Sequence, residues 1–351
     1  MSIESRKTTM EIEETIRNLR REGRLDEALS IGLNQLGEFN NENAITYSWL
    51  AKSSIACGNF MKANSYLKKK LRIYFHLIGR EKLDVAWTYD AIGENLRMLN
   101  EHEKAREYYD KALAILQKLY GPNHKYIANV LDHKAESFAV EDNLIEATGW
   151  FMTEVDNLRH SDGCQIRDIS DVYYRLSELY MLKGDYHSAS KYGIQAVKET
   201  SYNHKKARIY RLLGINARME GNHLAALNQF KKELSYHGKE YMPLEIDLGI
   251  NYLDIGRELN ALGRLSEAQR SLAKGFKIYQ PILQLRVNNP EADSWAIAES
   301  YEIIGRFHVE MGNLTEGIKH FKKAITHYGS KSQEALELRQ EIIALQEEPR
   351  S

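Results

Sequence analysis

Apolar and small residues recur along this chain in a frame that repeats about every 42 positions. A small residue in one segment of helical periodicity is followed seven residues later by glycine, asparagine or aspartate, and five residues after that by a second small residue. These positions are held by Ala51, Gly58 and Ala63 in the first complete unit, and the frame continues to a unit that ends on Gly317. Seven consecutive units satisfy all three positions, so the chain is a repeat array.

The spacing within a unit predicts a helical hairpin. Two antiparallel helices approach closely only where both carry small side chains, and the turn between them favours residues that tolerate a left-handed backbone. A degenerate unit, with Gly23 at the turn and Ala28 after it, precedes the complete ones. We therefore expect an all-α chain of about eight hairpins. In six units a large apolar residue stands four residues after the second small position, and Gly193 breaks this pattern in the remaining one. The large residues are expected to fill the gap to the next hairpin: Leu67, Tyr109, Phe151, Phe230, Leu272 and Phe321.

The junctions between hairpins are predicted from local turn chemistry. In YGPNHKYIANVL, residues 120–131, Gly121 can end a helix in a left-handed cap, Pro122 forbids its continuation, and Asn123 can cap the next helix. Residues 280–294 predict a longer loop or a helix extension that ends near Val287. Residues 332–346 have apolar positions at helical spacing and predict a capping helix, which open arrays need.

The segments MLNEHEKAREYYDKAL, MLKGDYHSASKYGIQAV and MEGNHLAALNQFKKEL carry the frame, and the pattern resembles the tetratricopeptide repeat over about residues 9–330. The resemblance implies a right-handed α-solenoid over residues 1–330 without a domain boundary, followed by a capping helix and short tail over 331–351. The helix-ending proline of that family is largely missing, so other contacts must form the junctions. The segment KALAILQKLYGPNHKYIANVL is similar to the 42-residue units of kinesin light chains, but Asp90-Ala91 and Asp132-His133 stand where that type has paired asparagines.

Composition, charge and the motifs that are missing argue against several classes of function. The 351 residues carry a formal net charge of −1, which gives no drive toward nucleic acid, and no run of about 18 apolar residues indicates a membrane span. The cysteines Cys57 and Cys164 are far apart, and the N-terminus has no apolar signal segment, so we expect a reducing, cytoplasmic location. We find no phosphate-binding loop, nucleophile elbow or zinc spacing, and expect no enzyme activity, no cofactor and no bound metal.

Solenoids of this kind bind partners on a concave surface lined by the first helix of each hairpin. The frame predicts that acidic side chains dominate this surface in units three to five and basic ones in units six and seven, so that an extended peptide binds in one direction. The alternative is that the charges pair across neighbouring hairpins. The aromatic candidates can be binding anchors or packed core residues. The predicted groove residues are Trp49, Trp87, Asp90, Glu94, Asp132, Glu136, Tyr174, Glu178, Arg208, Arg211, Arg218 and Arg257.

The sequence therefore predicts a non-enzymatic scaffold or adaptor that binds a protein or peptide segment with basic and acidic portions. The sequence predicts neither nucleic acid nor a membrane as a partner. It does not indicate the oligomeric state. One alternative is a peptide-sensing regulator similar to bacterial quorum-sensing repeat proteins. Those regulators carry an extra N-terminal module, whereas repeats here begin by about residue 9. Another alternative is a secreted bacterial effector on the same scaffold. Replacement of Asp90, Asp132 and Glu136 by lysine is expected to abolish binding of a basic peptide.

Overall fold

The computed structural model describes residues 3–160, 169–237 and 245–347, and helices account for nearly all of them. The helices pair into eight hairpins, followed by α17 (Gln333–Glu347), as the repeat frame predicts. Cys164 and the tail residues 348–351 lie outside the described residues. Within the described ranges, every helix is too short or too polar to cross a membrane.

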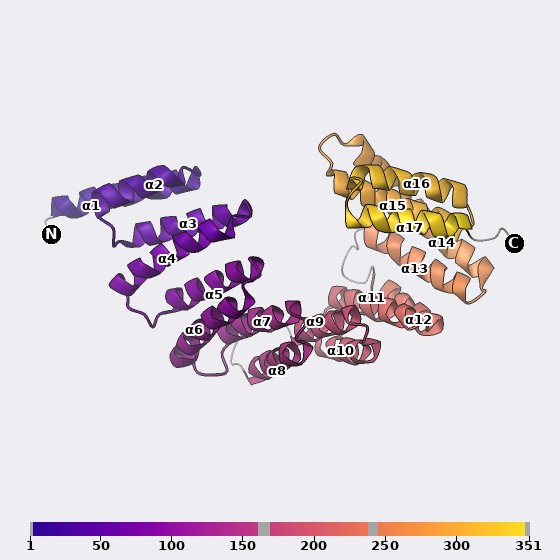
Figure 1. Cartoon of the computed structure of the whole chain (residues 1–351), viewed down its shortest axis with the longest axis horizontal. Helices are drawn as coiled ribbons and strands as arrows, with labels where there is room; N and C mark the ends of the chain where they lie inside the picture. Colours follow the sequence, from indigo (N-terminus) through magenta and orange to yellow (C-terminus); the bar gives the residue numbers. More distant parts are fainter. Residues whose placement is uncertain (1–2, 161–168, 238–244, 348–351) are drawn as a thin grey trace. The chain divides into compact units, whose positions relative to one another are not determined.

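The two helices of each hairpin are joined by three residues, and Figure 1 shows them in chain order. A short π-helical segment, Gly32–Leu36, follows the first hairpin. The hairpins are α1 (Ile3–Arg21) and α2 (Leu25–Ile31), α3 (Asn41–Ala56) and α4 (Phe60–Leu77), α5 (Leu83–Met98) and α6 (His102–Tyr120), α7 (Lys125–Val140) and α8 (Leu144–His160), α9 (Ile169–Leu182) and α10 (Tyr186–Glu199), α11 (Asn203–Met219) and α12 (His223–Tyr236), α13 (Glu245–Ala261) and α14 (Leu265–Asn288), and α15 (Ser294–Glu310) and α16 (Leu314–Tyr328).

The hairpin turns have the backbone that the frame predicts. Asn100 and Asp142 have φ angles of 60° and 64°, and they are the non-glycine residues with positive φ in the described chain. Glycine holds the corresponding turn position in the other hairpins, also with positive φ. Asparagine and aspartate tolerate this left-handed region better than other side chains. The turn position is therefore selected for backbone conformation.

The large apolar residue four positions after the second small one packs in two directions. A Cβ atom added at Gly93 would lie 2.4 Å from the ring of Tyr109, and one added at Gly214 would lie 2.6 Å from the ring of Phe230. These rings therefore cover the small residue of their own hairpin. The reason is geometric: the missing side chain leaves a hollow in the first helix that the facing ring occupies. The rings also reach the next hairpin, as expected: the ring centroid of Tyr109 lies 5.9 Å from that of His133 in α7, and Phe230 belongs to a cluster with Ile255 of α13.

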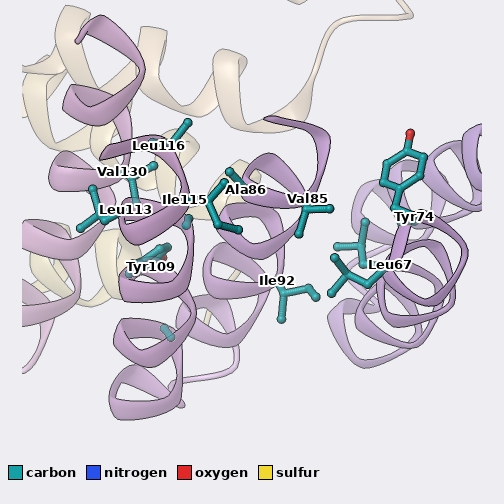
Figure 2. Close-up of a cluster of buried hydrophobic side chains, with 14 of the residues drawn as sticks. Leu67, Tyr74, Val85, Ala86, Ile92, Tyr109, Leu113, Ile115, Leu116 and Val130 are labelled. Atoms are coloured by element: carbon teal, nitrogen blue, oxygen red, sulfur yellow. The ribbon is translucent and has the colours of Figure 1, made fainter. Parts of the chain in front are cut away.

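The buried side chains pass from one hairpin to the next. In Figure 2, Leu67 of α4 lies beside Ile92 of α5, and the cluster continues through Tyr109 of α6 to Val130 of α7. Separate clusters follow later in the chain, such as the one that joins Tyr279 of α14 to the helix α15. Each hairpin thus buries its apolar surface against its sequence neighbours, as solenoid repeats do.

The chain divides into two compact units, residues 1–172 and 173–351, and the division falls within α9. The first unit holds the hairpins from α1 to α8. The second unit holds most of α9, the helices α10 to α16, and the last helix α17. The single continuous array remains a prediction, as does the handedness of the solenoid.

Two junctions refine the sequence predictions. Gly121 ends α6 with a φ of 81°, as predicted, but the cap of the next helix is His124, not Asn123. His124 has an extended backbone, and its Nδ1 atom accepts a hydrogen bond from the backbone N–H of Tyr126 at 3.3 Å. Of the two alternatives for residues 280–294, the helix extension is correct, because α14 continues through Pro281 to Asn288.

Candidate functional site

A cluster of charged side chains lies on α5 and α7, the first helices of neighbouring hairpins in the first unit. Asp90 Oδ1 lies 2.8 Å from Nδ1 of His133. Arg97 donates hydrogen bonds of 3.1 and 3.0 Å to Glu94, and it reaches Glu136 on α7 at 3.6 Å. Several predicted groove acids are therefore brought together, and Arg97 and His133 neutralise much of their charge.

The surroundings of the cluster favour the charged forms. Burial alone would lower the pKa of His133, but the hydrogen bond and the charge of Asp90 outweigh it and raise that pKa to about 9. For Glu94 the directions are reversed. Burial alone would raise its pKa, but hydrogen bonds from Arg97 and from the hydroxyl of Tyr109, the latter at 2.6 Å, hold the pKa of Glu94 below its usual range. At neutral pH His133 is thus a cation within an ion-pair network.

The remaining predicted residues of the first unit differ in accessibility. Asp132 is 1% exposed, so its carboxylate lies inside the fold. Trp87 is half-buried at the edge of the hydrophobic cluster and meets the ring of Tyr126 edge-on, with 5.2 Å between ring centroids. Trp49 is 45% exposed on α3. Because Asp90 and Asp132 are buried, their replacement by lysine would disturb folding, and that charge reversal is unsuitable as a test of surface binding.

Ion pairs also join neighbouring hairpins in the second unit. Arg218 on α11 lies 2.7 Å from Asp254 on α13 and also pairs with Glu258, which is fully buried. Arg257 on α13 lies 2.8 Å from Glu310 at the end of α15. These contacts correspond to the alternative in which charges pair across neighbouring hairpins, so Arg218 and Arg257 serve at least to join repeats.

Two other predicted residues, Arg208 and Arg211, line a cavity of about 460 Å³ beside α11, α12 and α13. Arg208 is exposed, and its guanidinium carbon lies 4.2 Å from the ring centroid of Tyr174 on α9. Burial and a hydrogen bond with Glu178 raise the pKa of Tyr174. Four predicted groove residues thus meet at or beside this cavity. Its lining residues are His204, Ala207, Arg208, Arg211, Glu233, Tyr236, His237 and Asp247.

The cavity contains acids that the sequence reasoning missed. Glu233 is 2% exposed, and its Oε1 atom lies 3.7 Å from Arg211 and 3.4 Å from Nε2 of His237. Glu258 was missed too, although the frame contains a signal for it. The position two after the first small residue is polar and buried in several units, where Asn95, Asn216 and Glu258 stand. A recurrent polar residue at one core position indicates a contact between hairpins.

The described residues place aromatic and charged side chains at accessible positions. Within the described ranges, no group of three or more histidine, cysteine, aspartate or glutamate side chains is placed to hold a metal ion. What the first helices do present is an exposed aromatic ring on α3 and a charged cavity beside α11. Such features suit binding of a protein segment, in which buried anchors supply affinity and charge supplies orientation.

Comparison with known proteins places these hairpins in a family. Two family models described as tetratricopeptide repeat match the chain, one over residues 42–118 and the other over residues 170–199 and 298–326. The matched segments coincide with α3 to α6, with α9 and α10, and with α15 and α16. A search of curated proteins gave no match.

Solved structures share the fold at low sequence identity. A tetratricopeptide repeat protein from Parabacteroides merdae has 15% identity and a TM-score of 0.50, covering 87% of this chain and 99% of its own. The C-terminal part of a repeat-containing protein from Cytophaga hutchinsonii has 12% identity and a TM-score of 0.50, covering 82% and 97%. At these identities the likeness concerns the fold alone, and the kinesin light chain type of the repeats stays a prediction. The repeat frame, the paired helices and the family matches agree, and the chain is a tetratricopeptide repeat protein.

Proposed function

We propose that this protein is a non-enzymatic adaptor that binds a protein or peptide segment on the surface formed by its first helices. Tetratricopeptide arrays are generally scaffolds for protein–protein interaction and are typically not catalysts. We place the adaptor in the cytoplasm, on the basis of its cysteine usage. Since fold alone does not determine function, the proposal rests on a particular site.

The observation that carries the proposal is the cavity beside α11, α12 and α13. Arg208 is exposed there, and its guanidinium lies against Tyr174, with which it also forms a hydrogen bond, so that the side chain is held at the cavity. A guanidinium binds a carboxylate through two parallel hydrogen bonds, so this position suits the acidic portion of a partner segment. Glu233 is engaged by Arg211 and His237, so Arg208 and Asp247 are the other charged side chains of the lining.

Affinity also requires an apolar contact. Charges on an exposed surface contribute about 0.2–1 kcal/mol per pair, which sets orientation and association rate more than affinity. In the second unit, Tyr236 supplies apolar surface within the cavity itself. In the first unit, Trp49 supplies a separate exposed ring. We propose that each acts as an anchor for a partner segment in its own unit.

The test is affinity capture from a lysate of the source organism, followed by mass spectrometry. Wild-type protein is compared with Arg208→Glu and with the matched control Arg270→Glu. Arg270 is an exposed arginine on α14 whose guanidinium bonds only a carbonyl of its own helix, that of Ser266, in the described contacts. We expect a partner that wild type and Arg270→Glu retain and Arg208→Glu loses. Identical partner lists for all three proteins would contradict the assignment of the cavity.

A further inference from the structure

A second cavity lies in the same unit among α14, α15 and α16, and it shares no lining residue with the cavity beside α11. Its volume is about 270 Å³. The second helices α14 and α16 contribute most of its polar lining, and the extension of α14 beyond Pro281 forms one side. The lining residues are Phe276, Gln280, Leu283, Gln284, Val287, Asn288, Tyr301, Ile304, His308, His320 and Lys323.

Two histidines in this cavity have unsatisfied hydrogen-bonding atoms. The rings of His308 and His320 stack with 5.3 Å between centroids and 15° between planes. Phe276 packs edge-on against His308, and Tyr301 packs against His320, so both rings are held in place. The Nδ1 atom of each ring is buried, and neither has a hydrogen-bond partner among the residues that the structure describes. Because buried polar atoms are nearly always paired in native proteins, two such atoms in one cavity indicate a missing partner.

The charges around the cavity indicate the chemistry of that partner. Lys323 lines the cavity with its ammonium 5.1 Å from the ring centroid of Tyr301, and in the described part of the chain it forms no ion pair. The lining contains no aspartate or glutamate. The acid that acts on the two histidines is Glu316, which is exposed and already paired with Lys319 at 3.2 Å. A cavity with hydrogen-bond donors, a cation and no carboxylate favours an anion.

We propose that this cavity binds an oxyanion group, either a carboxylate or a phosphate, between Lys323 and the imidazoles of His308 and His320. The amides of Gln280 and Gln284 provide further donors at the cavity wall. Drug-sized ligands occupy cavities of about 300–1,000 Å³, so this cavity, whose volume lies just below that range, suits a single anionic group or side chain. This site shares no lining residue with the cavity beside α11 that carries the adaptor proposal.

The proposal includes a pH dependence. Burial lowers the pKa of both His308 and His320. For His320 the neighbouring imidazole of His308 and the cations Lys323 and Lys319 act in the same direction, against the opposing effect of Glu316, and its pKa falls to about 4. Both imidazoles are therefore neutral at neutral pH in the empty cavity. A bound anion favours their protonated forms and raises both pKa values, so by linkage the anion binds more tightly as the pH falls.

The experiment is an NMR titration of the full chain with histidine labelled in the ring, using inorganic phosphate in one series and acetate in the other. Signals of His308 and His320 are assigned with His308→Gln and His320→Gln. We expect both signals to move to saturation with at least one probe, and their pKa values to rise in its presence. The probe that binds identifies the oxyanion as a phosphate or a carboxylate.

Two exposed lysines of α16 provide the specificity control. Lys323→Gln removes the cation that lines the cavity and is expected to weaken anion binding about tenfold, because a charge-assisted hydrogen bond to the anion is lost. Lys322→Gln changes a neighbouring exposed lysine outside the lining and is expected to bind as wild type does. Histidine signals that stay unmoved by both probes, or that move equally in wild type and Lys323→Gln, would overturn the proposal. Because the probes are small anions, this outcome leaves the adaptor proposal unaffected.

Discussion

At the scale of single residues, the small position in the first helix of each hairpin determines how closely the two helices pack. Gly93, Gly214 and Gly256 each lie under a large side chain from the facing helix of the same hairpin. At Gly93 the covering ring is that of Tyr109, whose hydroxyl also donates to Glu94 in the charged cluster. One position thus connects the packing of the hairpin with the geometry of the candidate surface.

A pair of glycine-to-alanine substitutions tests this packing. Gly93→Ala places a methyl group about 2.4 Å from a ring that is tied to Glu94, and overpacking of this kind costs about 1–3 kcal/mol. Gly149→Ala, in α8, has no heavy atom within 4 Å of the new methyl group and is expected to gain about 0.5–1 kcal/mol from helix propensity. Urea unfolding measures both free energies. Equal effects of the two substitutions would argue against the close contact.

The pairing of His133 with Asp90 predicts a dependence of stability on pH. The folded pKa of His133, about 9, is raised from the ordinary value of 6.5, so its contribution is complete below about pH 6.5 and is lost as the pH rises through 9. The contribution is on the order of 3 kcal/mol. We expect the free energy of unfolding of wild type to exceed that of His133→Gln at pH 6, and the difference to shrink by pH 9.5. A difference that is constant over this range would refute the pairing; His160→Gln, at an exposed histidine, is the control.

At the scale of elements, buried asparagines join successive hairpins through hydrogen bonds of their side-chain amides. The side-chain amide of Asn95 in α5 donates to Asn64 in α4 at 2.9 Å, and that of Asn216 in α11 donates to the carbonyl of Tyr186 in α10 at 2.8 Å. Asn251 in α13 likewise donates to the carbonyl of Phe230 in α12 at 3.1 Å. Each bond links a first helix to the second helix of the preceding hairpin.

The last helix provides a test at this scale. Leu338 in α17 is 2% exposed and belongs to the cluster that covers Phe321 of α16, whereas Leu336 in the same helix is substantially exposed. Leu338→Ala is expected to cost about 2–5 kcal/mol, and Leu336→Ala at most about 0.5 kcal/mol. Hydrogen exchange of α16 and α17 measures the effect locally. Similar exchange rates in the two variants would show that α17 does not cap the array.

The elements also show how far the sequence could predict the fold. The turn positions, including Asn100 and Asp142, followed directly from the frame, because a left-handed backbone restricts residue choice strongly. The cap at His124 was missed by one residue, since asparagine is the more common capping residue and the contact depends on the ring rotamer. In the same way, the approximate location of Asp90 was predictable, but not its burial beside His133. That contact joins residues from two hairpins and depends on side-chain direction.

At the scale of the whole molecule, the chain consists of two units whose hairpins bury surface mainly against their sequence neighbours. In such arrays, local stability follows the amount of surface that each hairpin buries. The first hairpin has a small cluster of Ile16, Leu19 and Ala28, whereas α4 to α7 share a large one. We expect amides of α1 and α2 to exchange with solvent much faster than those of α5 and α6. Comparable protection in hydrogen-exchange mass spectrometry would contradict this prediction.

The central claim is that the cavity beside α11, α12 and α13 binds the acidic portion of a partner segment. The most direct measurement is calorimetric titration of the captured segment into wild type, Arg208→Glu and Arg270→Glu at low and at physiological salt. We predict at least tenfold weaker binding to Arg208→Glu, unchanged binding to Arg270→Glu, and weaker binding to wild type at the higher salt. Equal affinity for all three proteins would contradict the claim.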